Sequence, residues 1–306
     1  MGRRMETEEI WDCIVVGAGP AGLSAAIYMG RFRRRTLVIS DGDGRWSYGQ
    51  RNENYLGFPE GVSARQLHEL GVAQAERFDV AFCAACVTAV THDGKGYRLE
   101  TSMGPWAART LIWATGVRDH WPAFSGARRL VGTYLFWCIV CDGWRTRDKD
   151  VLIFGNADSV GSTILQFLTY TRRLTVLVDP EKDELSLDMQ ARLEAEGVAV
   201  RRGSVKRVHH AGGMLREVVL ADDTVLEPDY LFSLLGSTPK TALLKDLPVA
   251  LDGRGHVVID DKNRTGLATF FAAGDVSNKH SHQVVSAAHE GAMSAQAANH
   301  VLYFND

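Results

Sequence analysis

The sequence predicts an α/β fold with two dinucleotide-binding units, and one repeated pattern predicts it. A β-branched run, Ile14–Val16, leads into Gly17-Ala18-Gly19-Pro20-Ala21-Gly22, and the small and apolar residues of a packed helix follow. The same order of apolar run, turn, helix and second apolar run returns over residues 151–178. Strands that alternate with helices are typical of parallel α/β sheets. The second unit therefore indicates an internal repeat of the first.

The glycines of the first turn are spaced for a ligand that carries a pyrophosphate. Gly17 permits the tight turn, Gly19 lets the backbone approach the pyrophosphate, and Gly22 lets the helix pack close to the strand. The next strand, Thr36–Ile39, ends at Ser40-Asp41, where an adenosine ribose would lie. Asp41 is interpreted either as a ribose acceptor or as a turn residue, and both interpretations stay open.

The chain then passes through a loop, a helix and a strand. Residues 45–60 are rich in Asn, Gly, Tyr and Trp, and the stretch around Asn54 could line a ligand. A helix is expected over Ser63–Phe78, with Ser63 as its N-cap, and a strand over Val80–Val90. Because side chains alternate along a strand, Cys83 and Cys86 would point to opposite faces, and both are interpreted as core thiols.

A cysteine pair follows the next strands. The runs at residues 97–101 and 110–113 are expected strands, the second ends in Ala114-Thr115-Gly116, and residues 117–122 suit a domain crossing. Trp137-Cys138-Ile139-Val140-Cys141-Asp142-Gly143 comes next. Cysteines at this spacing can close a small disulfide ring when the second opens a helix, because a helix N-terminus lowers the pKa of a thiol.

A redox centre is the leading hypothesis for this pair, with Asp142 as an acid–base partner. The alternatives are a zinc half-site or two unrelated buried thiols. A zinc ribbon needs a second pair about 15–20 residues away, and the pair at residues 83 and 86 is too distant.

The turn of the second unit departs from the glycine pattern. Ala157 and Val160 stand at the second and third glycine positions, where each added Cβ reduces clearance. The following strand leads into Asp179-Pro180-Glu181-Lys182-Asp183-Glu184, without an arginine pair for a 2′-phosphate. We therefore expect poor NADPH binding, although Asp179 is compatible with weak NADH binding. The alternative is that the loop simply tolerates these residues.

Further strands are expected at residues 198–201, 205–209, 217–220 and 230–234, and the last segment carries a second ligand candidate. A strand ending in Ala273-Gly274-Asp275 would place Asp275 against ligand hydroxyls at a helix N-terminus. The final helix is expected over Gln283–Leu302. His280, His282 and Glu290 could suggest a metal site, but they lack a recognised spacing, so no metal is predicted.

Length and composition agree with a globular protein whose partner is a small molecule or another protein. The 306 residues suffice for two domains of about 100–200 residues each. With 45% hydrophobic residues and a net charge of −3, nothing favours a nucleic-acid binder or a membrane-surface protein. No apolar run reaches the roughly 18 residues of a membrane span, and a cytoplasmic protein is expected. Five cysteines are too few for a disulfide framework.

Together and in this order, the motifs resemble those of the low-molecular-weight thioredoxin reductases over nearly the whole chain. The motifs are Gly17-x-Gly19-x-x-Gly22, Ala114-Thr115-Gly116, Cys138-x-x-Cys141-Asp142-Gly143 and Ala273-Gly274-Asp275. The resemblance implies two Rossmann-like domains of three ββα layers, the second inserted in the first. Residues 1–118 and 244–306 would form the FAD-binding domain, and residues 119–243 the inserted domain with the redox disulfide.

The resemblance also implies residue roles and partners. Cys141 would face the flavin of FAD, Cys138 would attack the protein substrate, and Asp142 would supply the proton. Asp275 would bind the ribityl chain, and Trp137 and His282 would either contact the flavin or its disulfide or pack beside the cofactor. The residues expected to bind FAD are Gly17, Gly19, Pro20, Ala21, Gly22, Ser40, Asp41, Asn54, Ala114, Thr115, Gly116, Gly274, Asp275, His282, Gln283 and Val284. Such enzymes are usually homodimers.

The degenerate second turn is similar to that of the deeply rooted, ferredoxin-linked branch, so ferredoxin is the candidate donor.

Three candidate functions follow from these observations. The first is a disulfide reductase that passes electrons from FAD through the cysteines to thioredoxin or a similar protein. The second is a dithiol oxidase that passes electrons from a small dithiol through FAD to oxygen. The third is a flavin-binding regulator without turnover, against which the retained cysteines and Asp142 argue.

Overall fold

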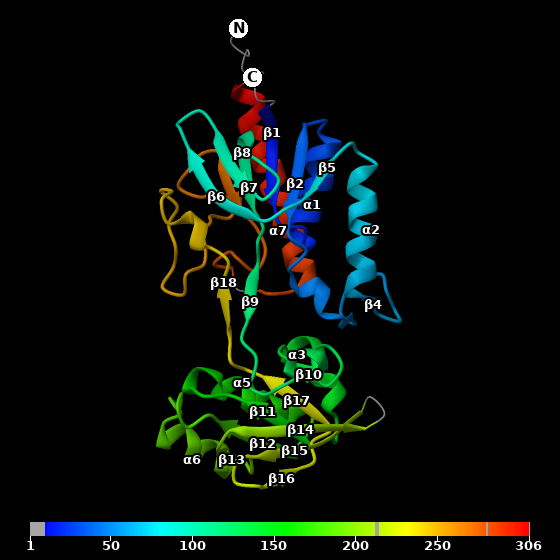
Figure 1. The fold of residues 1–306 in the computed structure, drawn as a ribbon, viewed down its shortest axis with the longest axis vertical. Coiled ribbons are helices and arrows are strands. Elements are labelled where there is room, and N and C mark those ends of the chain that lie inside the picture. Colours follow the sequence, from blue (N-terminus) through cyan, green and yellow to red (C-terminus); the bar gives the residue numbers. More distant parts are fainter. Residues whose placement is uncertain (1–9, 212–213, 280, 306) are drawn as a thin grey trace. The chain divides into compact units, whose positions relative to one another are not determined.

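The computed structural model describes residues 10–211, 214–279 and 281–305, which form two compact units (Figure 1). Unit 1 comprises the described residues up to Tyr48, Tyr55–Arg118 and the described residues from Thr238 onward, and unit 2 comprises Gly49–Asn54 and Asp119–Ser237. The chain returns to unit 1 after Ser237, whereas the sequence analysis ends the inserted domain at residue 243. The predicted fold class, two Rossmann-like α/β domains with the second inserted in the first, is confirmed.

A seven-stranded sheet forms the centre of unit 1, in the order β5-β2-β1-β8-β7-β6, with β19 also paired to β8. Its strands are β1 (Ile10–Val16), β2 (Thr36–Ser40), β5 (Ala81–Ala84), β6 (Val87–His92), β7 (Tyr97–Thr101), β8 (Trp106–Trp113) and β19 (Phe270–Ala272). The strand β1 pairs in parallel with β2 and β8, whereas β6, β7 and β8 pair antiparallel. Cys13, Ile14 and Val15 are fully buried, as expected for a central strand covered on both faces.

Alternate residues of the strands feed two cores, one on each face of this sheet. On one face, Val15 and Phe271 pack with alanines of α1 (Pro20–Arg31) and α7 (Val284–Asn305), which lie side by side in Figure 1. On the other face, Ile14 and Trp113 pack with apolar residues of the segment 244–259. The helix α2 (Ala64–Glu76) packs against α1.

The helices α1 and α7 approach closely because α7 has a glycine at the contact. A Cβ built on Gly291 would collide with the backbone carbonyl of Ala21 and lie 3.0 Å from the backbone nitrogen of Ala25. Because the obstructing atoms are backbone, they cannot rotate away. This contact fixes the first turns of α1 against the C-terminal helix.

Unit 2 contains a five-stranded parallel sheet in the order β10-β17-β11-β12-β13. The strands are β10 (Leu135–Phe136), β11 (Val151–Phe154), β12 (Leu174–Val178), β13 (Ala199–Arg202) and β17 (Tyr230–Ser233). Ile153, Val176 and Phe232 are fully buried and pack with Phe167 and Leu193 from the neighbouring helical segments. A separate antiparallel sheet joins β14 (Val205–Ala211), β15 (Met214–Leu220) and β16 (Val225–Leu226).

The remaining elements are short. They are β3 (Arg51–Asn52), β4 (Val62–Ser63), β9 (Val117–Asp119), β18 (Ser237–Pro239), α3 (Ala127–Leu130), α4 (Ile139–Asp142), α5 (Gly161–Gln166), α6 (Leu187–Ala195), and the 3₁₀ turns η1 (Arg45–Tyr48), η2 (Gly143–Thr146), η3 (Asp158–Val160), η4 (Phe167–Thr169) and η5 (Ala242–Leu244). None of the helices in the described part of the chain combines the length and the apolar character that a membrane span requires.

The prediction of one strand over Val80–Val90 is wrong, and the interpretation of Cys86 as a core thiol is wrong for the same reason. Val80–Val90 is not one strand, because β5 pairs with β2 at one edge of the sheet while β6 pairs with β7 at the other. The chain must leave the first edge between them. Cys83 is half-buried in β5, whereas Cys86 lies in the connection and is exposed, so Cys86 is not a core thiol.

We predict that Gly291→Ala destabilises unit 1 by about 1–3 kcal/mol, because the added methyl overpacks the contact with α1. Helix propensity alone would make alanine the better residue by about 1 kcal/mol, so a loss of stability isolates the contact. Urea unfolding measures the difference. Gly253→Ala is the control, since a Cβ there meets nothing within 4 Å; equal stability of both variants would contradict the close approach.

Candidate active site

Cys138 and Cys141 form a disulfide in unit 2, with their Cα atoms 5.3 Å apart. They follow β10 directly, and the short helix α4 begins at Ile139 with Cys138 as its N-cap. The expectation that the second cysteine opens the helix is therefore wrong. The reason is local: the extended backbone of Cys138 lets its carbonyl and its sulfur face the first turn. Both cysteines are partly exposed.

The Cys138 sulfur accepts a hydrogen bond from the Cys141 amide, with 3.1 Å between Sγ and N. The Cys138 carbonyl accepts from the amides of Cys141 and Asp142. An amide donor to sulfur stabilises a thiolate more than a thiol, because the bond strengthens with charge on the acceptor. This geometry favours Cys138 as the sulfur that carries negative charge after reduction.

Asp142 is the buried carboxyl of this site. Its side chain is 7% exposed, and its Oδ1 accepts a hydrogen bond from Nε of Arg145 at 2.9 Å. Burial raises the pKa of Asp142 to about 6, and the hydrogen bond and charge of Arg145 oppose the rise. A carboxyl with a pKa near neutrality can both hold and release a proton at physiological pH, which is what dithiol chemistry requires.

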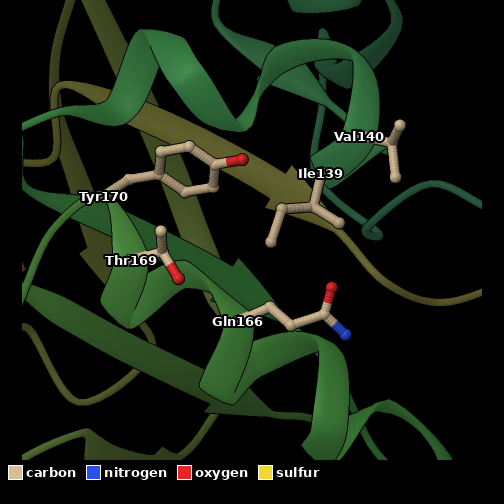
Figure 2. Close-up of a pocket in the computed structure, with 5 residues that line it drawn as sticks. All are labelled: Ile139, Val140, Gln166, Thr169 and Tyr170. Atoms are coloured by element: carbon tan, nitrogen blue, oxygen red, sulfur yellow. The ribbon is translucent and has the colours of Figure 1, made fainter.

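A small pocket lies beside the disulfide helix. It has a volume of about 120 Å³ and is lined by Ile139, Val140, Gln166, Thr169 and Tyr170 (Figure 2). The Tyr170 ring packs against Gly143, where a Cβ would lie 2.8 Å from it. The pocket is smaller than the roughly 300–1,000 Å³ of sites for small molecules. It therefore belongs to the local packing around the helix that carries the disulfide.

In unit 1, hydrogen bonds between strand ends bring the predicted cofactor turns together. The Gly17 amide donates to Ile39 at the end of β2, the Ala114 amide to Val16 at the end of β1, and the Ala273 amide to Trp113 at the end of β8. The carboxyl ends of parallel strands meet at one edge of a sheet, where α/β proteins bind their ligands. Four sequence segments far apart in the chain thus meet at this edge.

The first glycine turn has space for a pyrophosphate. Gly17 has φ +106°, and a Cβ there would collide with the Ala114 carbonyl. A Cβ on Gly22 would collide with the Gly17 carbonyl, but one on Gly19 would meet nothing within 4 Å. Gly19 is the N-cap of α1 without a side-chain cap, and Pro20 opens the helix. The free space at Gly19 thus lies at the N-terminus of α1, next to Ala21. Phosphate groups bind at such helix N-termini because the free amides and the helix dipole favour negative charge there.

Asp41 makes a turn contact. Its Oδ1 accepts from the Asp43 amide at 3.0 Å, and the Ser40 hydroxyl accepts from the Gly42 amide at 3.2 Å. This hydrogen bond is the one expected if Asp41 is a turn residue. The Asp41 side chain is also exposed, so its role as a ribose acceptor stays a proposal. Thr115, between Ala114 and Gly116, donates to the Lys240 carbonyl at 2.9 Å, which anchors that crossing within unit 1.

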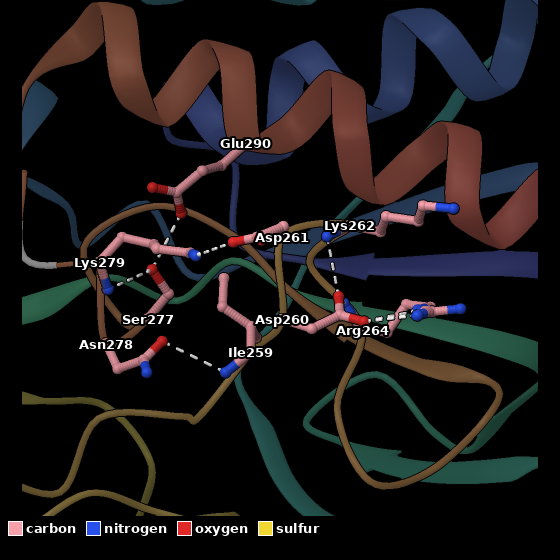
Figure 3. A network of polar contacts seen from close by, with 9 residues as sticks. All are labelled: Ile259, Asp260, Asp261, Lys262, Arg264, Ser277, Asn278, Lys279 and Glu290. Carbon is pink, nitrogen blue, oxygen red and sulfur yellow. Dashed lines mark hydrogen bonds and ion pairs between the residues drawn. The ribbon is translucent and has the colours of Figure 1, made fainter.

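The Ala273-Gly274-Asp275 turn is held by a buried glutamate on α7. Glu290 accepts a hydrogen bond from the Gly274 amide at 2.8 Å. It also accepts one from the Ser277 hydroxyl at 2.9 Å (Figure 3). Burial raises the pKa of Glu290. Asp275 forms an ion pair with Arg45 at 2.7 Å. Glu290 therefore shapes the turn. His280, another residue of the metal hypothesis, lies outside the described residues.

The other predicted cofactor residues are spread over both units. Gln283 precedes α7, where its amide donates to the Ser286 hydroxyl, and Val284 is the first residue of the helix. His282 adopts φ +45°, which turns the chain into α7. Asn54 belongs to unit 2, whereas the turns described above belong to unit 1.

The turn of the second unit differs from the first in what lies against it. Ala157, the counterpart of Gly19, forms a β-bridge with Glu184, whose amide donates to the Asn156 carbonyl at 2.7 Å. The Asp158 carboxylate accepts from the Ser186 amide at 2.8 Å. The segment 179–186, which we call the β12 loop, therefore lies against this turn. Met189 packs on Gly161, where a Cβ would meet its side chain.

The charged side chains of the β12 loop already have partners, some in the loop and some in the segments beside it. The Asp179 carboxylate accepts from the Glu181 amide at 3.1 Å, and the Asp179 amide donates to the Asn156 side chain. Arg202, on the neighbouring strand β13, bonds Asp183 and Gln190, each at 2.6 Å.

The sequence matches the family described as pyridine nucleotide-disulphide oxidoreductase over residues 11–298. The chain belongs to that family. A thioredoxin reductase of Treponema pallidum (strain Nichols) is 32% identical to it over 96% of this chain and 97% of its own length, and one of Bacillus subtilis (strain 168) is 28% identical over 97% and 96%. The structure of a thioredoxin reductase from Streptococcus pyogenes MGAS5005 has a TM-score of 0.88 at 26% identity and covers 97% of this chain and 100% of its own.

The chain is thus a flavoprotein oxidoreductase of the thioredoxin reductase type. Members of this family bind FAD. The residues of unit 1 fit that cofactor, because the turn at Gly19 has the clearance and the uncapped helix that a pyrophosphate needs. Thioredoxin reductases of this size also share the two-domain α/β fold seen here.

Sequence reasoning missed three side-chain contacts that support the two sites. Arg45 pairs with Asp275, Glu290 holds the turn at Gly274, and Arg145 bonds Asp142. Arg145 stands three residues after Asp142, a spacing at which helical side chains meet, so that contact had a sequence signal. The other two contacts link segments far apart in the chain and had none.

We predict that Asp142→Asn gains stability relative to the natural chain as pH rises from 4 to 8. Between pH 4 and 6 the Asp142 carboxyl is protonated in the folded protein and ionised in the unfolded one, so the natural chain loses stability across that window. A shift from 3.8 to about 6 corresponds to a relative change of about 2–3 kcal/mol. Urea unfolding of the oxidised proteins at both pH values measures it, and a difference that stays constant with pH would refute the buried ionisation.

Proposed function

We propose that the protein is a disulfide reductase in which electrons from FAD reduce the Cys138–Cys141 disulfide, and the resulting dithiol reduces thioredoxin or a similar protein. The observation that carries the proposal is the disulfide in a partly exposed turn, followed directly by a buried carboxyl with a pKa near 6. A structural disulfide would need neither the exposure nor the carboxyl. The relatives named thioredoxin reductase support the choice of acceptor.

The proposed chemistry assigns one step to each residue. When bound, FAD supplies a two-electron reductant. Two electrons and one proton convert the disulfide into one thiol and one thiolate, and Asp142 donates that proton. The Cys138 thiolate, stabilised by the Cys141 amide, attacks the disulfide of the substrate and forms a mixed disulfide. The Cys141 sulfur then attacks Cys138 in the mixed disulfide, which re-forms the Cys138–Cys141 bond and releases the second sulfur of the substrate. The proton of the Cys141 thiol passes to the product, and a second proton taken up from water completes the substrate dithiol.

We propose further that NADPH is a poor donor and that reduced ferredoxin takes its place, as in the ferredoxin-linked branch. The β12 loop supports this, because it bonds the turn that a pyrophosphate would have to approach. An acidic side chain, Asp158, also stands at the start of η3, where it disfavours a phosphate. We extend the proposal to a cytoplasmic homodimer with FAD held by the turns of unit 1.

We predict that reduced ferredoxin bleaches the flavin under anaerobic conditions, whereas NADPH and NADH at the same concentration bleach it at least tenfold more slowly. Absorbance at the flavin band follows the reaction, and oxidised thioredoxin added afterwards should restore it. Rapid bleaching by NADPH would refute the donor assignment. Failure of thioredoxin to restore the band, together with bleaching by a small dithiol and recovery in oxygen, would replace the reductase by the dithiol oxidase.

We predict that Cys138→Ser lowers thioredoxin reduction by more than 100-fold and leaves FAD bound, because serine cannot form the mixed disulfide. Flavin content and insulin-coupled turnover measure the two properties. Cys86→Ser is the control, since Cys86 is an exposed thiol of unit 1 outside both sites, and it should retain full turnover. Survival of activity in Cys138→Ser would show that the cysteine roles are wrongly assigned.

A further inference from the structure

We propose that Arg145, held in place by Glu53, is a positioning residue that sets the ionisation of Asp142 during dithiol exchange. The inference rests on the proposed function, because it concerns the carboxyl to which that function assigns the proton. All three residues belong to unit 2, and Glu53 comes from the segment 49–54 that precedes most of that unit in the sequence.

Arg145 bonds the two carboxylates with different nitrogens of its guanidinium group. Its Nε donates to Oδ1 of Asp142 at 2.9 Å, and its Nη2 donates to Oε1 of Glu53 at 3.1 Å. The two contacts fix both ends of the planar group. Lysine could not reproduce them, because its ammonium is a point charge without this fork.

Two aromatic rings also confine the guanidinium group. Its Cζ lies 4.8 Å from the centre of the Trp144 ring and 5.7 Å from that of Phe136. Cations within about 6 Å of an aromatic ring are attracted to its face. Phe136 ends β10, directly before Trp137 and Cys138, so the segment that leads into the disulfide also holds the arginine.

The charges that face Asp142 act in opposite directions. Burial raises its pKa, the Arg145 hydrogen bond and charge lower it, and the Glu53 charge raises it again. Arg51 also approaches Glu53, with 3.4 Å between Nε and Oε1, and its side chain is half exposed. Glu53 therefore has two effects: it fixes Arg145 in reach of Asp142, and its charge offsets part of the arginine charge.

The balance has a consequence for proton release. Without Arg145, burial would raise the pKa of Asp142 further, and the carboxyl would release its proton to the disulfide less readily. Without the Glu53 charge, Arg145 would act on Asp142 undiminished, and more of the carboxyl would be ionised at neutral pH. Opposite effects of two neighbouring substitutions are expected from an electrostatic network and not from loss of packing.

Infrared titration of the Asp142 carboxyl in the oxidised holoprotein tests the proposal, with Asp142→Asn identifying the band. We expect Arg145→Met to raise the titration midpoint by at least one pH unit, a tenfold change in proton affinity, and Glu53→Gln to lower it. Arg145→Lys, which keeps the charge, should raise it less than Arg145→Met. Arg173→Met is the matched control, because Arg173 pairs with Asp150 on the exposed surface, and it should leave the midpoint unchanged.

Unchanged midpoints in both Arg145 variants, or shifts in the same direction for Arg145→Met and Glu53→Gln, would overturn the proposal. Should Arg145→Met fail to fold, Arg145→Lys and Glu53→Gln still give opposite predicted shifts. The titration uses neither an electron donor nor thioredoxin, so its result is independent of the proposed function. If the natural chain did not reduce thioredoxin, the proposed function would be refuted, but the titration result would still stand.

Discussion

The structure of unit 1 depends on backbone packing that no side chain could enter. A Cβ on Gly17 would collide with the Ala114 carbonyl, one on Gly22 with the Gly17 carbonyl, and one on Gly291 with the Ala21 carbonyl. Each obstructing atom would be backbone, so none of these contacts can adjust to a larger residue. The strand ends then meet through the amides of Gly17, Ala114 and Ala273. The edge of the sheet at which FAD is proposed to bind is thus formed by this close approach of backbone segments.

Unit 2 applies a different constraint, the burial of one carboxyl beside a disulfide. Asp142 follows Cys141 in the chain, and it is the buried residue of the short helix α4. Arg145, in the turn that follows, limits the cost of that burial. Because a few consecutive residues supply the sulfurs, the carboxyl and the guanidinium group, their relative positions depend mainly on local backbone geometry.

The local parts of this structure could be predicted from the sequence, and the contacts over long sequence distances could not. The glycine turn at residues 17–22, the cysteine pair and the repeat at 151–178 follow from spacing and periodicity, and the fold class follows from them. Arg45 with Asp275 and Glu290 with Gly274 join distant segments, so no spacing reveals them. The strand prediction at Val80–Val90 failed because an apolar run does not show at which edge of a sheet it pairs.

The β12 loop limits how this chain could acquire a new electron donor. Its bond from the Glu184 amide to the Asn156 carbonyl joins backbone to backbone, so no exchange of side chains in the turn removes it. Glycines placed at positions 157 and 160 would still face the same loop. Under the proposed function, recovering NADPH use would therefore require a different loop length or path and not a point substitution alone.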